Sequence, residues 1–226
     1  SGGRFFSTFL IFLSPLKNHS IEGYQMLTSS LFLFFLVSLY AFLYLLLRRS
    51  IATKNIVFLF AFCSLALFSF IPNLHQFAYW LCAEATYLIA AALWLWSVVF
   101  NVLLAQPKHE KKWWLWLLAI LISTALVGCS EVAMLLNIIP LSLHYFYRKQ
   151  MKTVMPKGFW LLSIIFFIVV FATVFSGGNL NRHHSTPFSG NILLAFSGGF
   201  YAAGFWLSKW ALIFMPITCF YILVFG

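Results

Sequence analysis

Long apolar runs alternate with short polar stretches along the whole chain. Runs of about 20 apolar residues match the length that an α-helix needs to cross the hydrocarbon core of a bilayer. Seven runs are expected to form spans, near residues 24–47, 55–71, 85–104, 113–127, 132–147, 159–175 and 207–225. The pattern therefore predicts an all-α fold, a polytopic bundle of transmembrane helices in a single domain.

Two of these spans depend on dividing one long run. The 35 residues from Trp113 to Tyr147 are too many for one ordinary span. The sequence Gly128-Cys129-Ser130-Glu131 interrupts the run, and we expect a tight turn there. Without that turn, the loops on either side could not alternate between the two faces of the membrane.

Two other stretches are not expected to span. Residues 1–23 mix charged and aromatic side chains, and their apolar part, Phe5–Leu13, is too short to cross a bilayer. Residues 176–206 open with a polar loop and continue with many Gly, Ser and aromatic residues. Both stretches are expected to lie at one membrane surface as loops or interfacial helices.

The positions of the charges support this division. The chain is 63% hydrophobic and 8% charged, which excludes an ordinary soluble domain. Ten of its 14 Lys and Arg residues fall in three loops, around residues 48–54, 106–112 and 148–157. Since Lys and Arg concentrate in cytoplasmic loops, these loops should face the cytoplasm. The net charge of +10 thus follows from topology and gives no reason to expect nucleic acid.

Four glutamates supply all the acidic side chains. Glu84 and Glu131 each lie at an outer span boundary, where a buried carboxylate costs at least about 2.5 kcal/mol and so indicates a functional site. Equally, each could simply complement the dipole of a helix start. Glu22 and Glu110 lie near surfaces and need no such explanation, and His144 is expected to be packed or interfacial.

The loop of residues 176–186 is the most polar stretch outside the basic loops. Arg182 can bind a phosphate or carboxylate in a bidentate manner, and Asn179 belongs to a turn that exposes backbone N–H groups. The alternative is an arginine that reaches the lipid headgroups or pairs with a glutamate. His183 and His184 follow at once, and together with His75 and the glutamates they could bind a divalent metal, although no spacing is diagnostic.

Cysteines indicate neither a zinc nor a haem motif, because no CxxC or CxxH spacing occurs. Cys82 and Cys129 each precede an outer-face glutamate by two residues. A disulfide between them is open on this evidence, since only geometry can decide it.

Four short motifs resemble, in order, patterns of an uncharacterised family of bacterial polytopic membrane proteins related to the GT-C glycosyltransferases. They are Gly3-Arg4-Phe5, Tyr79-Trp80 followed by Glu84 and Tyr87, Gly128-Cys129-Ser130-Glu131, and Gly178-Asn179 followed by Arg182. The acidic residues of that family's first outer loop have no counterpart here. We therefore expect them, and one further span, upstream of Ser1.

The resemblance implies a GT-C-like enzyme in the bacterial cytoplasmic membrane that takes a sugar from a polyprenyl-phosphate donor at the outer face. It implies Arg182, Arg4 and Asn179 as ligands of the donor phosphate, and Glu84 and Glu131 as catalytic groups. His75, His183, His184 and Tyr87 would line the same cavity. Two alternatives remain: a lipid-linked glycan transporter, or a non-catalytic subunit working with other membrane proteins.

Overall fold

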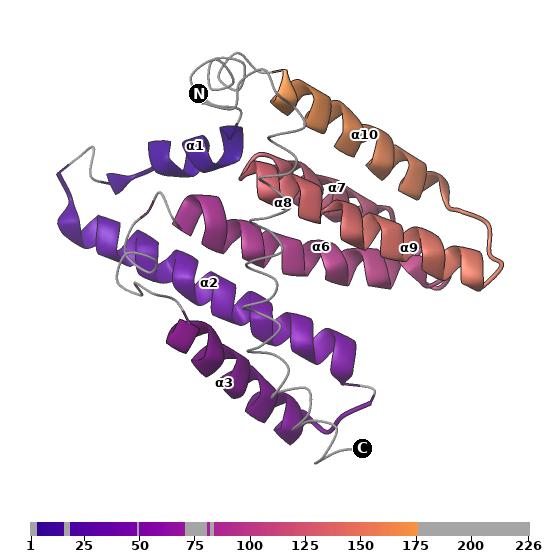
Figure 1. The fold of residues 1–226 in the computed structure, drawn as a ribbon, viewed down its shortest axis with the longest axis horizontal. Coiled ribbons are helices and arrows are strands. Elements are labelled where there is room, and N and C mark those ends of the chain that lie inside the picture. The colour runs from indigo at the N-terminus through magenta and orange to yellow at the C-terminus, as the bar shows by residue number, and fades with distance from the viewer. Residues whose placement is uncertain (1–3, 16–18, 49, 71–80, 82–83, 176–226) are drawn as a thin grey trace, which may run out of the picture. The chain divides into compact units, whose positions relative to one another are not determined.

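The computed structural model describes residues 4–15, 19–48, 50–70, 81 and 84–175 (Figure 1). The chain divides into two units, Ser1–Asn179 and Leu180–Gly226, and every described residue belongs to the first. All regular structure in these ranges is helical. The elements are α1 (Phe5–Phe12), α2 (Ile21–Leu47), α3 (Thr53–Phe70), the π-helical turn η2 (Glu84–Leu88), α6 (Ile89–Ala105), α7 (Trp113–Val127), α8 (Glu131–Leu136), α9 (Ile138–Gln150) and α10 (Lys157–Val174).

Three helical segments are long and apolar enough to cross a membrane, namely Ile21–Leu47, Thr86–Ala105 and Lys157–Val174. Thr53–Leu67 and Trp113–Val127 are shorter apolar helices. The all-α character and the presence of helices long and apolar enough to span a membrane are thus confirmed for the described part of the chain. The count of seven spans stays a prediction, and the last span, 207–225, lies outside the described residues together with the loop at 176–206.

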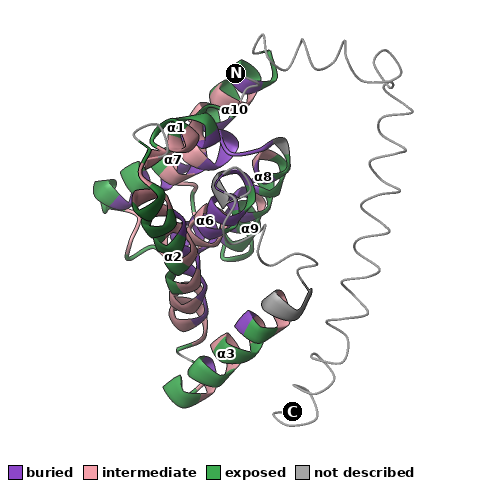
Figure 2. Cartoon of the chain, turned by 90° about the vertical axis from the view of Figure 1, so that its left-hand side faces the viewer, coloured by how far each residue is buried: buried purple, intermediate pink, exposed green. Residues whose placement is uncertain are grey.

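Helix α6 is the central element of the described unit. In its most apolar stretch 67% of the residues are buried, against 22% for α2 and for α10. It packs against α2, α7 and α9, and in Figure 2 the buried colour is visible on α6 and on the segments around it. The outward faces of α2, α3 and α10 are largely exposed and apolar, as expected for surfaces that contact lipid.

The span predicted at 132–147 is interrupted. It consists of α8 and α9, separated at Asn137, where the backbone remains close to helical. Pro140 has no N–H to donate to the carbonyl of Leu136, four residues earlier, and such a gap breaks or kinks a helix. The indole Nε1 of Trp94 on α6 donates to that carbonyl instead, at 3.0 Å.

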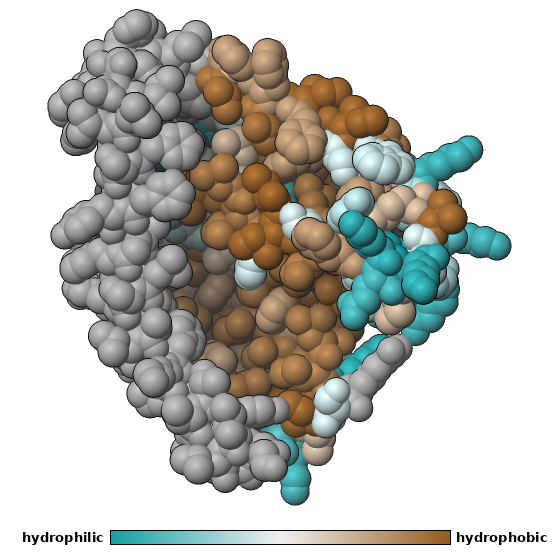
Figure 3. All heavy atoms as spheres, turned by 45° about the vertical axis from the view of Figure 1, so that its right-hand side comes forward, coloured by the Kyte–Doolittle hydropathy of each residue, from teal (hydrophilic) through white to brown (hydrophobic). Residues whose placement is uncertain are grey.

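The three basic loops meet at one end of the described unit. Arg148 at the end of α9 bonds to the carbonyl of Leu104 at the end of α6 and to Glu110 in the following loop. At the start of α10, a Cβ on Gly158 would come within 2.4 Å of the Trp116 indole, so α10 and α7 approach closely there. Hydrophilic atoms gather along one side of the surface in Figure 3, beside a broad apolar face.

Candidate functional site

Helix α1 docks on the turn between α7 and α8, at the end opposite the basic loops. The backbone N–H groups of Phe6 and Ser7 donate to the carbonyl of Gly128 at 3.0 and 3.3 Å. The hydroxyl of Ser7 donates to the carbonyl of Cys129 at 2.8 Å. Three bonds between segments about 120 residues apart therefore fix the start of the described chain against this turn.

Gly128 is required for this docking by its size. A Cβ built on it would lie 2.5 Å from Cζ of the Phe5 ring, closer than any real contact. Any larger residue would push the ring of Phe5 away and loosen α1. The glycine of one motif thus accommodates the phenylalanine of another.

The start of α6 completes this cluster. Ile89 and Ala90 pack with Cys129 and Ala133, and Phe6 of α1 covers the same group. The turn that leads into α6 is the π-helical η2, and such turns occur frequently at functional sites. Segments carrying three of the four motifs therefore lie together: α1, η2 with the start of α6, and the turn at 128–131.

The predicted site residues differ in how much of each the structure describes. Arg4 lies immediately before α1, is partly buried and already has an interaction partner. Tyr87 in η2 is 56% exposed. For Glu84 and Glu131 the backbone is placed at the first residue of η2 and of α8, while their side chains lie outside the described part. Outside the described residues altogether are His75, Asn179, Arg182, His183 and His184.

Helix α8 begins with a serine cap. The hydroxyl of Ser130 accepts from the backbone N–H of Ala133 at 3.1 Å, a common N-cap arrangement. Glu131 is then the first helical residue, a position where the helix dipole stabilises a negative charge. Because Ser130 already caps the helix, capping alone does not require a glutamate at 131.

Cys129 is fully buried in this cluster, with a free thiol. Burial raises the pKa of Cys129 to about 12, although the nearby Ser7 hydroxyl opposes the shift. The thiol is therefore inert at neutral pH and acts as a packing group. Cys82, considered above as a disulfide partner of Cys129, lies outside the described residues.

Within the described ranges no three His, Cys, Asp or Glu side chains come together as ligands for a metal ion. The three histidines considered for a metal all lie outside those ranges. The divalent metal therefore stays a prediction.

A buried polar row, which the sequence interpretation missed, runs between α6, α7 and α9. The hydroxyl of Ser97 donates to Oδ1 of Asn137 at 2.7 Å, and Nδ2 of Asn137 donates to Ser123 at 2.6 Å. All three side chains are buried, with at most 3% of their surface exposed. The amide of Asn137 thus connects the junction of α8 and α9 to both α6 and α7.

The row continues toward the basic end. Nδ2 of Asn101 donates to the carbonyl of Ser97, and Oδ1 of Asn101 lies 3.3 Å from Nδ1 of His144. Since an amide oxygen only accepts, Nδ1 of His144 is the donor. The imidazole is packed beside the rings of Trp116 and Phe159, which confirms that His144 is a packed side chain.

Arg148 lies at the end of the row. Its contact with Glu110 corrects the prediction that Glu110 is an ordinary surface residue. Nη2 of Arg148 lies 2.8 Å from Oε2 of Glu110, and the arginine side chain is only 2% exposed. Glu110 is thus the counter-ion of a buried cation rather than an ordinary loop residue. Spacing could have revealed the row, because Asn137, His144 and Arg148 recur at helical intervals within an apolar run.

Comparison of the chain with protein-family models, with curated proteins and with solved structures found no match. The function must therefore be inferred from the residues and contacts of the chain itself.

Proposed function

We propose that the protein is a GT-C-type glycosyltransferase that uses a polyprenyl-phosphate-linked sugar at the membrane face opposite the basic loops. The observation that carries the proposal is the convergence of α1, η2 and the turn at 128–131. These three segments come from distant parts of the chain, and each brings one ionisable residue, Arg4, Glu84 or Glu131, to the same end of the unit.

The three residue types suit transfer from a phosphate donor. A carboxylate, Glu84 or Glu131, takes the proton of the acceptor hydroxyl as its oxygen bonds to the anomeric carbon. The bond between that carbon and the phosphate oxygen breaks, and polyprenyl phosphate leaves with the electron pair. Arg4 and, by the motif resemblance, Arg182 with Asn179 stabilise the charge on the leaving phosphate.

Orientation follows from the basic loops. Positive charge gathers at the end formed by residues 48–54, 106–112 and 148–157, and cytoplasmic loops carry such an excess. The proposed site then lies at the outer face of a bacterial cytoplasmic membrane, where a polyprenyl-phosphate donor is held by its lipid tail. The bilayer is accordingly the first partner of the protein.

One observation favours a second candidate, a transporter of lipid-linked glycans. Transporters place polar residues near the middle of the bilayer. Ser97 lies in the middle of α6 and Ser123 in α7, and both bond to Asn137, which joins α8 to α9 within the span predicted at 132–147. However, these side chains bond to one another at 2.6 and 2.7 Å, which leaves them engaged in holding helices together.

The test measures sugar transfer by the full chain in proteoliposomes that contain radiolabelled polyprenyl-phosphate mannose or glucose and a lipid extract as acceptor. Glu84→Gln and Glu131→Gln are tested separately, and the variant that removes the base should lose about 100-fold in rate or more. Arg182→Ala should lose a similar factor through the leaving phosphate. Glu22→Gln is the matched control, because Glu22 is an exposed carboxylate in the first turn of α2.

Three results would contradict the proposed glycosyltransferase activity. Full activity in both glutamine variants would remove the proposed base. Movement of the labelled lipid between leaflets without transfer would identify a transporter. Neither transfer nor movement with both donors would indicate a non-catalytic subunit.

A further inference from the structure

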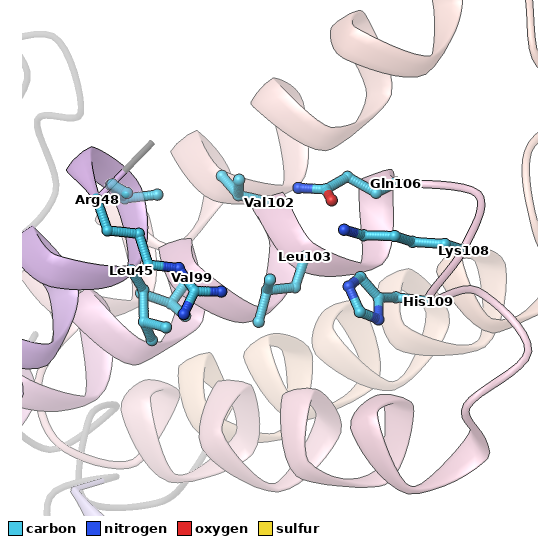
Figure 4. A pocket seen from close by; sticks show the side chains of 9 residues that line it. Leu45, Arg48, Val99, Val102, Leu103, Gln106, Lys108 and His109 are labelled. Carbon is cyan, nitrogen blue, oxygen red and sulfur yellow. The ribbon is translucent and has the colours of Figure 1, made fainter. Parts of the chain in front are cut away.

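A pocket opens at the basic end, away from the proposed catalytic face. It has a volume of about 140 Å³ and lies between the end of α2, the second half of α6 and the turn that follows α6. Its lining includes Arg48, Val102, Leu103, Gln106, Lys108 and His109 (Figure 4). The space is roughly ten times what one water molecule needs, so it admits a phosphate group.

The pocket is amphipathic. Five of its lining residues are aliphatic and come from α2 and α6, while the polar ones come from the two helix ends and the turn. In Figure 4 the polar ends of Gln106, Lys108 and His109 point toward the α2 side, and the guanidinium of Arg48 extends toward the centre. Two permanent cations and an amide thus surround one opening above an apolar wall.

The charge of the pocket is not neutralised by its own lining. No carboxylate lines it in the described part of the chain. Glu110 in the same turn does not line the pocket, and its carboxylate lies 2.8 Å from Nη2 of Arg148. The Arg48 guanidinium lies 5.7 Å from the Tyr44 ring, a contact that holds the cation in place without cancelling its charge.

We propose that this pocket binds the phosphate of an anionic phospholipid from the leaflet that faces the basic loops. The pocket lies at the ends of two candidate spans, Ile21–Leu47 and Thr86–Ala105, and so at the depth of lipid headgroups. Basic pockets between transmembrane helices on the cytoplasmic side are known to bind such headgroups. The aliphatic wall then contacts the glycerol and the first methylenes of the acyl chains. This site does not depend on the proposed glycosyl transfer.

The test titrates the purified full chain, in a neutral detergent, with phosphatidylglycerol and measures the 1:1 complex by native mass spectrometry. Arg48→Gln/Lys108→Gln removes both cations and should weaken binding roughly thirtyfold. Each basic residue near a lipid headgroup contributes about 1 kcal/mol to binding, and about 1.4 kcal/mol corresponds to a tenfold change in affinity. Lys111→Gln/Lys112→Gln removes the same charge from exposed residues of the same turn that do not line the pocket, and should change binding less than about threefold.

A second variant separates the lipid from a free anion. Val102→Phe fills the apolar wall and leaves every charge in place, so it should weaken phosphatidylglycerol binding but not the binding of inorganic phosphate. Equal weakening by the two glutamine pairs would overturn the pocket in favour of diffuse attraction. Tighter binding of inorganic phosphate than of the lipid, or equal binding of phosphatidylcholine, would overturn the lipid assignment.

Discussion

Arg148 is a fully buried cation whose guanidinium has few partners. Its Nη2 donates to Glu110 and to the carbonyl of Leu104, while its Nε has no partner among the described residues. A buried charge that loses its counter-ion is far more costly than a pair replaced by apolar groups. Most of the stability effect of this pair should therefore appear when only one member is changed.

Glu110→Gln should lower the stability of the protein by about 1–3 kcal/mol, because the arginine stays buried without an opposite charge. The expected loss of stability is not larger because Glu110 is 33% exposed, so water can partly replace its carboxylate. Thermal unfolding of the purified variants in detergent measures the effect.

Two further variants complete the test of this pair. Glu110→Gln/Arg148→Met should recover most of the loss, and Glu22→Gln, at an exposed carboxylate, should change little. A double variant less stable than Glu110→Gln alone would mean that the arginine does not depend on this carboxylate.

At the scale of elements, the break between α8 and α9 is stabilised by a side chain from α6. The carbonyl of Leu136 would be without a helical partner because Pro140 has no N–H, and Trp94 supplies the donor. The proline and the tryptophan should therefore be energetically coupled although they lie on different helices.

A double-mutant cycle tests this coupling. Trp94→Phe should cost about 1 kcal/mol in the hydrogen bond when Pro140 is present. In the Pro140→Ala background the new N–H can bond to Leu136, so the same change should cost less. A coupling energy of zero, measured by thermal unfolding of the four proteins, would contradict the compensation.

Particular elements show what the sequence reveals. The spans at 24–47, 113–127 and 159–175 correspond closely to α2, α7 and α10, because a long apolar run has few alternatives in a membrane. The turn at Gly128–Glu131 was also predicted, from the length of the run that it divides. The break at Asn137 was missed, although Pro140 was a visible signal.

The site was harder to predict than the spans. The motifs indicated that α1, η2 and the turn at 128–131 belong together, and the structure does bring these segments into contact. The pairing of Arg148 with Glu110 joins residues 38 positions apart, one in the last turn of α9 and the other in the turn after α6. Such a contact depends on how α6 and α9 pack, and no local pattern of apolar and polar residues encodes it.

At the scale of the whole described unit, the helix ends fall into two sets. Residues near 45–48, 104–110, 148 and 158 form one set, joined by the pocket, the Arg148 pair and the contact of Gly158 with Trp116. The contacts of α1 with the turn at Gly128 belong to the other set. This separation is what the alternation of basic and non-basic loops requires.

Two single cysteines test the orientation. In a variant lacking the native cysteines, Lys112→Cys and Glu22→Cys should react with a membrane-impermeant maleimide from opposite sides of the membrane when the protein is expressed in bacteria. Glu22→Cys should label in spheroplasts and Lys112→Cys only in inverted vesicles, because the proposed topology places the basic loops in the cytoplasm. Both residues are exposed, so burial does not limit the reaction. Labelling of both from one side would reject the topology.

The central position of α6 also determines the order in which the chain can assemble. Its polar groups, Ser97 and Asn101, bond to Asn137 and His144, which a ribosome makes only after α7 is complete. During synthesis, Ser97 and Asn101 of α6 must therefore face lipid, water or a helper protein until these partners have been made. Until α9 has been made, Asn101 lacks the contact that His144 provides in the folded chain.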